Sequence, residues 1–298
     1  MTILELPKDD LLALSDVQLE QLIGRLAEAE VSAYGASVAD VRFSGSITAP
    51  DGGVDVRVVI SSEPFKSGFI PRTNTVFQSK KHSMPAGAIA EEMKPKGTLS
   101  TVIGQLCEGG GAYVIVSLDD DCTDTMRTAR LAAMKAAVAD QPKKDDIYLA
   151  FFARSKLLQW LRHPPGVLLW VRSALGKPLS GWQPYGQWSY VPVGGSDSLI
   201  EAPGISVVLP LDRHKKLTIA DALTPTRQMI ADSNKAIRVA GLSGVGKTRF
   251  VQALFDEKIG TDALDRTTVI YADTGANPIP SARQMIDQLI ETGKQATV

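Results

Sequence analysis

The chain has 298 residues, of which 44% are hydrophobic and 22% charged, a composition that indicates a globular protein and excludes a mainly disordered or fibrous one. Its 32 lysines and arginines against 33 aspartates and glutamates leave a net charge of −1. That balance excludes a protein held to nucleic acid by bulk positive charge, although not one with a local basic groove. The length suffices for about two domains.

No secretory or membrane-spanning segment is evident in the sequence. The first residues, MTILELPKDD, lack the basic start and long apolar stretch of a signal peptide. Apolar runs such as residues 166–171 are far shorter than the roughly 20 residues that a membrane helix needs. Cys107 and Cys122 are too few for a disulfide framework and lack zinc-ligand spacing. We therefore expect a soluble, cytoplasmic protein with reduced thiols and no membrane partner.

The first part of the chain predicts helices and strands in alternation. Ser15 and Gln18 form a capping box, after which apolar residues recur at helical spacing. Alternating or continuous apolar residues predict strands, and Ala- and Met-rich stretches predict helices, in this order: helix 16–31, strands 54–60 and 75–80, a helical region ending near Cys107, strand 112–116, helix 126–139, strand 147–152, and two short helices broken at 163–166. This order predicts an α/β or α+β domain closing near Gly176.

The rest of the chain predicts two further segments. Residues 177–213 are rich in Gly, Pro, Ser and Trp, which indicates a β-rich connector with candidate strands over 188–193 and 205–211. From residue 214 onward, helical and strand patterns return. The expected domains are therefore 1–176, 177–213 and 214–298.

A phosphate-binding motif lies in the third segment. Residues 241–248 read GLSGVGKT, preceded by an apolar run over 236–240 that predicts a strand and followed by a predicted helix over 249–258. This is the Walker A pattern, in which Gly241, Gly244 and Gly246 let backbone N–H groups close around phosphates. Lys247 would reach the β- and γ-phosphates of ATP, and Thr248 would bind Mg²⁺.

Little chain follows this motif. One more strand is expected over 267–272, and no apolar strand ending in a suitable Mg²⁺ carboxylate follows it. We expect the chain to be the front part of a longer protein. Nucleotide binding is plausible for it, whereas ATP hydrolysis by this piece alone is not expected.

A second constellation lies on the predicted hairpin. The period of two in a strand places Gln78 and Lys80 on one face, and pairing with the first strand would bring that face to Asp55. A carboxylate, an amide and an ammonium group would then converge. Phosphodiester cleavage with Mg²⁺ needs an acidic metal ligand and a nearby lysine that orients or activates the attacking water. The plainer alternative is an ion pair between Asp55 and Lys80 across the strands.

The triplet pattern is weak evidence without this context. Other acidic- or Gln-x-Lys triplets occur, but none is on a predicted strand that follows an acidic strand: Gln141-Pro-Lys143, Glu92-Met-Lys94 and Asp256-Glu-Lys258.

The arrangement of a helix, GGVDVRVVI, a hairpin loop and VFQSKKH resembles the PD-(D/E)XK nuclease superfamily, and more narrowly its Mrr-like restriction-endonuclease branch. The resemblance covers about residues 10–155 and implies a restriction-endonuclease-like α/β/α core. By this resemblance Asp55 is a metal ligand, Gln78 takes the place of the second acid, and Lys80 is the catalytic lysine. Glu20, on the first helix, matches a glutamate that often completes the metal shell of this branch.

A nuclease module followed by GLSGVGKTRFVQALFD resembles the front of a prokaryotic STAND-type NTPase, as in the Avs antiviral defence proteins. The resemblance implies a Mg²⁺-dependent DNA endonuclease that is controlled by ATP binding. Its substrate would be double-stranded DNA. A phage protein bound by a C-terminal region would trigger it, and a homo-oligomer would form on activation.

Two alternatives stay open on the sequence. One is a regulatory ATPase whose N-terminal domain keeps the nuclease fold but only binds nucleic acid or protein. The other is an NTP-dependent restriction endonuclease, which would require helicase-like motifs further along the chain.

Overall fold

The structure, a computed structural model, describes residues 4–43, 54–61, 67–189, 204–210, 212–232, 236–294 and 296–298. It is a mixed α/β protein whose chain forms two compact units. Unit 1 contains residues 1–184 and 267–298, and unit 2 contains residues 185–266. This division differs from the expected segments, because the last 32 residues return to the first unit.

Unit 1 is built around a five-stranded sheet in the order β1-β2-β3-β4-β5. Strand β2 pairs antiparallel with both β1 and β3, whereas β4 pairs parallel with both β3 and β5. The elements of unit 1 are η1 (Lys8–Ala13), α1 (Asp16–Ala33), η2 (Val38–Asp40), β1 (Val41–Phe43), β2 (Val56–Val59), β3 (Asn74–Lys80), α2 (Ala86–Met93), η3 (Pro95–Gly97), α3 (Thr101–Gly109), β4 (Ala112–Ser117), α4 (Asp124–Ala137), β5 (Tyr148–Ala153), α5 (Arg154–Leu161), α6 (Pro165–Ala174), β6 (Trp182–Pro184), β9 (Ile270–Ala272), η4 (Thr274–Ala276) and α10 (Ala282–Glu291).

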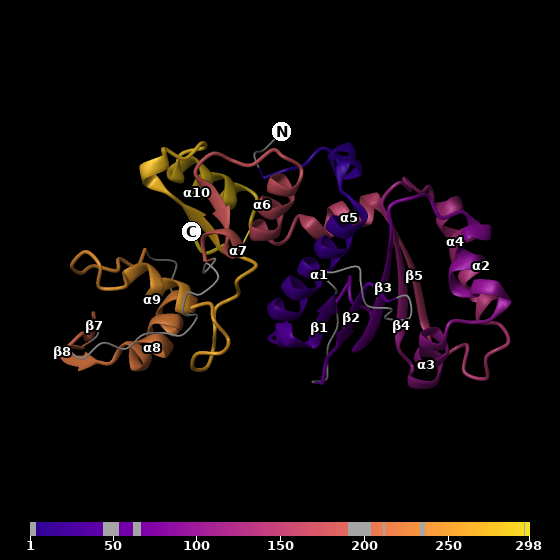
Figure 1. The fold of residues 1–298 in the computed structure, drawn as a ribbon, viewed down its shortest axis with the longest axis horizontal. Coiled ribbons are helices and arrows are strands. Elements are labelled where there is room, and N and C mark those ends of the chain that lie inside the picture. The colour runs from indigo at the N-terminus through magenta and orange to yellow at the C-terminus, as the bar shows by residue number, and fades with distance from the viewer. Residues whose placement is uncertain are drawn as a thin grey trace. The chain divides into compact units, whose positions relative to one another are not determined.

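Helices cover both faces of this sheet (Figure 1). Helix α1 packs on one face, where its leucines meet Val56, Val58 and Phe77 in one apolar cluster. Helices α2, α3 and α4 form a second cluster on the other face with Val76, Ile115 and other strand residues. Strand β4 is buried at every position because it lies between these two layers.

The predicted elements of this unit are confirmed with small shifts at their ends. The capping box of Ser15 and Gln18 begins α1 as expected. The predicted hairpin is also present, with β2 antiparallel to β3 and Val56 opposite Phe77. Strand β1, which the sequence reading missed, is only three residues long and adds an edge beside β2.

The end of the chain completes unit 1. Strand β9 pairs antiparallel with β6, with Trp182 opposite Ala272. Met285 and Leu289 of α10 join the apolar cluster that contains α1. Gly166 lies so close to the carbonyl oxygen of Thr267 that an added Cβ would approach it within 2.4 Å.

Unit 2 is smaller, and its described elements are α7 (Tyr185–Trp188), β7 (Val207–Leu209), β8 (Asp212–Leu217), α8 (Ile219–Ala231) and α9 (Lys247–Ala253). Buried Arg227 of α8 holds the segment after α9 by donating hydrogen bonds to five backbone carbonyl groups, those of Ala253, Leu254, Asp256, Ile259 and Thr261.

One strand prediction in this region is wrong, and a second lies mostly outside the described residues. Residues 236–240, expected to be the strand before the phosphate loop, have no strand pairing. The described strands offer them no partner, since β7 pairs with β8 and β9 pairs with β6 in unit 1. The candidate strand 188–193 begins with the end of helix α7, and its residues 190–193 lie outside the described part.

Among the described residues, we find no helix with the length and apolar character needed to span a membrane.

Candidate active site

Strands β2 and β3 position the three residues expected to carry chemistry. Asp55 directly precedes β2, while Gln78 and Lys80 lie at the end of β3. Side chains alternate along β3, so Gln78 and Lys80 share the face of Val76, which α2, α3 and α4 cover. The antiparallel register brings the start of β2 to this same end of β3.

The Asp55 carboxylate is fixed by the residue between Gln78 and Lys80. Its Oδ2 atom accepts hydrogen bonds from the backbone N–H of Ser79 at 2.5 Å and from the Ser79 hydroxyl at 2.6 Å. The chain bends at Asp55. The Asp55 carboxylate therefore accepts the Ser79 N–H in place of the backbone carbonyl that a longer β2 strand would offer. Asp55 therefore lies beside β3 at the level of the predicted site.

Gln78 presents a buried acceptor atom. The residue is 4% exposed, and its Oε1 atom has no hydrogen-bond partner among the described residues. A buried carbonyl oxygen without a donor costs about 1–3 kcal/mol. Such an atom in a folded protein calls for an explanation, and a bound cation is one that fits an oxygen ligand.

Lys80 forms an ion pair that the sequence reading did not find. Its Nζ lies 2.8 Å from Oε2 of Glu92, and about a quarter of each side chain is exposed. Glu92 belongs to the Glu92-Met-Lys94 triplet, which we set aside because it is not on a strand. The pair forms because α2 packs back against the sheet after the β3–α2 turn. The alternative ion pair of Lys80 with Asp55 is not among those of the described residues.

Tyr113 of β4 feels the negative charge of two of these carboxylates. Burial raises the pKa of its hydroxyl above the ordinary value, and the negative charges of Glu92 and Asp55 raise it further. The apolar pattern of β4 gave no reason to single out this tyrosine.

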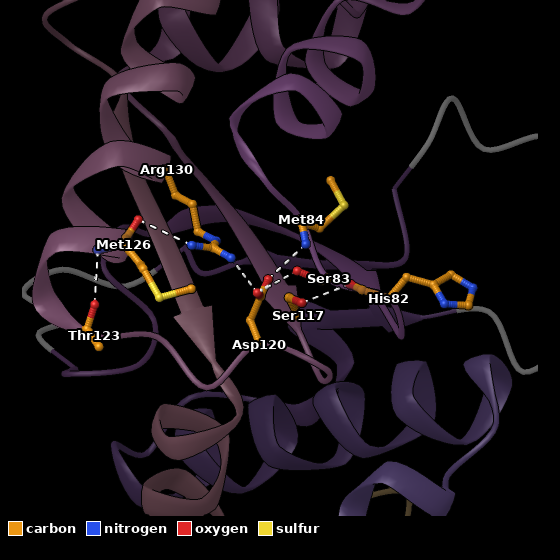
Figure 2. A network of polar contacts seen from close by, with 8 residues as sticks. All are labelled: His82, Ser83, Met84, Ser117, Asp120, Thr123, Met126 and Arg130. Atoms are coloured by element: carbon orange, nitrogen blue, oxygen red, sulfur yellow. Dashed lines mark hydrogen bonds and ion pairs between the residues drawn. The ribbon is translucent and has the colours of Figure 1, made fainter.

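A buried polar network holds the end of β4 to the start of α2 (Figure 2). Asp120 accepts hydrogen bonds from the Ser83 hydroxyl and from the backbone N–H of Met84, each at 2.8 Å, and it pairs with Arg130 of α4. Ser117 donates to the carbonyl of His82 at 2.9 Å. These contacts fix the β3–α2 turn, and with it the helix that carries Glu92.

The Asp120 carboxyl is held ionised. Burial by itself raises its pKa, but the hydrogen bonds from Met84 and Ser83 and the positive charge of Arg130 outweigh burial, so the pKa falls below the usual value. Because these donors fill its acceptor sites, Asp120 has a structural role and not a catalytic one.

Glu20, expected to complete the metal shell, lies on a helix that covers the other face of the sheet. Glu20 is half-buried on α1, whose apolar residues pack on the face of the sheet opposite to that of Gln78. Among the described residues, no three His, Cys, Asp or Glu side chains are grouped as they would be around a metal. A cation at Asp55 would therefore depend on the Gln78 amide and on water for further ligands.

In unit 2, the phosphate loop is an exposed turn. Gly244 and Gly246 have φ values of 81° and 86°, a conformation that favours glycine. Lys247 begins α9, and its Nζ donates to the carbonyls of Gly241 at 3.1 Å and Leu242 at 2.7 Å. Thr248 is exposed at the next position. The five motif residues thus lie together around one loop.

Comparison with known proteins adds no relative: no family model, no curated protein and no solved structure matches this chain.

Proposed function

We propose that the chain carries a Mg²⁺-dependent DNA endonuclease site at the end of β3, of the kind found in the PD-(D/E)XK superfamily. The observation that carries the proposal is the buried Oε1 of Gln78, which has no hydrogen-bond partner among the described residues and lies on the strand that bears Lys80. The adjoining Ser79 holds the Asp55 carboxylate. The order of a helix, an antiparallel hairpin and a parallel β–α–β unit supports a restriction-endonuclease-like core.

The residues present fit a magnesium ion. Mg²⁺ keeps several water ligands and commonly takes only one or two protein carboxylates. Asp55 and the Gln78 Oε1 atom would hold it. When bound, the ion would activate a water molecule and stabilise negative charge on the scissile phosphate.

The protein groups around this position have separate roles in the proposal. Glu92 holds the Lys80 ammonium at 2.8 Å, so that the charge is already in place when a phosphate arrives. Hydrolysis adds water to phosphorus and breaks one P–O ester bond, and the leaving oxygen takes up a proton. Lys80 would orient the attacking water and balance the charge that develops on the phosphate.

The test is cleavage of a supercoiled plasmid with Mg²⁺, compared with EDTA. We expect Lys80→Met to reduce the rate about 100-fold or more, as loss of one charge-stabilising donor does in other enzymes. Lys81→Met is the matched control, because it removes the neighbouring lysine and should leave the rate near that of the wild type. Equal rates for the two variants would place the activity elsewhere.

A second readout does not depend on cleavage. Mg²⁺ should raise the melting temperature of the wild type, and Asp55→Asn should abolish that shift. Gln78→Glu should strengthen Mg²⁺ binding by adding charge, whereas Gln78→Leu should remove it. A protein without any Mg²⁺ shift and without cleavage would favour the regulatory ATPase with a non-catalytic binding domain.

We further propose that Gly241, Gly244, Gly246, Lys247 and Thr248 bind ATP and control the nuclease. Support comes from the motif and from the positive φ of two of its glycines. Lys247→Ala should abolish binding of a fluorescent ATP analogue while leaving the Mg²⁺ shift of unit 1 unchanged. A role in defence against phage, with a phage protein as trigger and oligomerisation on activation, follows from the same resemblance and is tested by cleavage with ATP and infected-cell lysate.

A further inference from the structure

A pair of opposed arginines lies on the same face of the sheet as Gln78. In the β1–β2 register Arg42 is directly opposite Arg57, and in the β2–β3 register Arg57 is opposite Val76. Residues opposite each other project to the same face, so both arginines share the face of Val76 and Gln78. Gln78 is two residues beyond Val76, about 7 Å along the strand.

This part of the face is open. Arg42 is exposed, Arg57 is partly exposed, and Val59, next on the same face of β2, is 42% exposed. The apolar cluster under α2, α3 and α4 draws its strand residues from β3, β4 and β5. The antiparallel end of the sheet therefore exposes Arg42 and part of Arg57 beside the proposed site.

The two guanidinium groups repel each other in this arrangement. Like charges directly opposite on neighbouring strands destabilise a sheet. Neither guanidinium has an ion pair among the described residues, and the Nε atom of Arg57 is buried without a hydrogen-bond partner. An anion held between the two guanidinium groups would remove the repulsion. Guanidinium groups match the oxygen geometry of phosphate through paired hydrogen bonds.

We propose that Arg42 and Arg57 bind a backbone phosphate of double-stranded DNA next to the one that is cleaved. The inference rests on the proposed nuclease function, because it uses the distance from the arginine pair to Gln78. The pair would fix the register of the DNA strand over Asp55 and Lys80, as backbone contacts do in other protein–DNA complexes. It also supplies the local positive charge that a protein of net charge −1 needs to attract DNA.

The experiment measures binding of a short fluorescein-labelled DNA duplex to the full chain in EDTA, so that cleavage is not required. The variants are Arg42→Gln, Arg57→Gln and the double variant, and the control is Arg283→Gln, an exposed arginine on α10. We expect the double variant to bind about 10- to 100-fold more weakly, the range for loss of hydrogen bonds to a charged group. The slope of log K against log salt should fall by about 1, and Arg283→Gln should change neither value.

A competition measurement distinguishes a DNA phosphate site from a site for free phosphate. Inorganic phosphate at matched ionic strength should not displace the duplex, and displacement would mean that the pair is a site for free phosphate. Unchanged binding in the double variant would overturn the inference, as would a wild type that does not bind the duplex. The Mg²⁺ melting shift of Asp55 and Gln78 is measured separately, so either idea can fail while the other stands. Arg42→Gln, on an exposed edge position, keeps the test valid if Arg57→Gln fails to fold.

Discussion

The buried pair of Asp120 and Arg130 gives the sharpest prediction about stability. Asp120 is 3% and Arg130 is 6% exposed, so the pair has little access to water. In Asp120→Asn the side chain keeps its shape but loses its charge, and Arg130 is left as a buried cation without a counter-ion. Breaking a buried ion pair in this way costs about 3–5 kcal/mol. The same change replaces an acceptor oxygen facing Met84 or Arg130 by an N–H₂ group.

The assay is urea unfolding followed by tryptophan fluorescence. Trp188 belongs to unit 2, so a Trp188→Phe background leaves three tryptophans that report on unit 1 alone. The matched control is Asp124→Asn, whose side chain is 95% exposed in its pair with Arg127 and which should cost no more than about 0.5 kcal/mol. A double-mutant cycle with Arg130→Met should show a coupling of about 1–3 kcal/mol.

The pH dependence of this pair has a definite sign. Because the pKa of Asp120 is lowered in the folded state, its contribution is complete above the ordinary aspartate pKa of about 3.9 and is lost as the pH falls through the folded value. The difference in the free energy of unfolding between the wild type and Asp120→Asn should therefore become smaller below about pH 4. A cost below about 1 kcal/mol at neutral pH, or strict additivity with Arg130→Met, would refute this account of the network.

Two further predictions concern the rest of the chain. Arg227→Met should destabilise unit 2 by at least about 3 kcal/mol, because five backbone carbonyls lose their donor. Amide hydrogen exchange should then become faster over residues 253–261. Exchange protection equal to that of the wild type in this segment would contradict the prediction. Gly166→Ala should lower the free energy of unfolding by about 1–3 kcal/mol, since the new Cβ would clash with the Thr267 carbonyl. Gly176→Ala is the control for backbone strain, because Gly176 has a φ of 70° but open space around its Cβ position.

The sequence by itself determined the local structure of unit 1. Capping residues and helical spacing located α1, and alternating or continuous apolar residues located β2 to β5, because these patterns reflect which face of an element is buried. The hairpin prediction that brought Asp55 to the end of β3 followed from the same alternation. The proposed DNA-cleaving function and the ATP site remain predictions that the experiments above address.

Only the tertiary structure decided which distant groups meet. Glu92 reaches Lys80 because α2 packs back on the sheet, and Asp120 reaches Arg130 because two loops and α4 converge; neither pairing leaves a local pattern. The missing strand at residues 236–240 has the same cause. A strand needs a neighbour to pair its backbone groups, and β9, the strand that follows the phosphate loop in sequence, pairs instead with β6 of unit 1. Sequence patterns describe the burial of an element, whereas its partners are set by the packing of the whole chain.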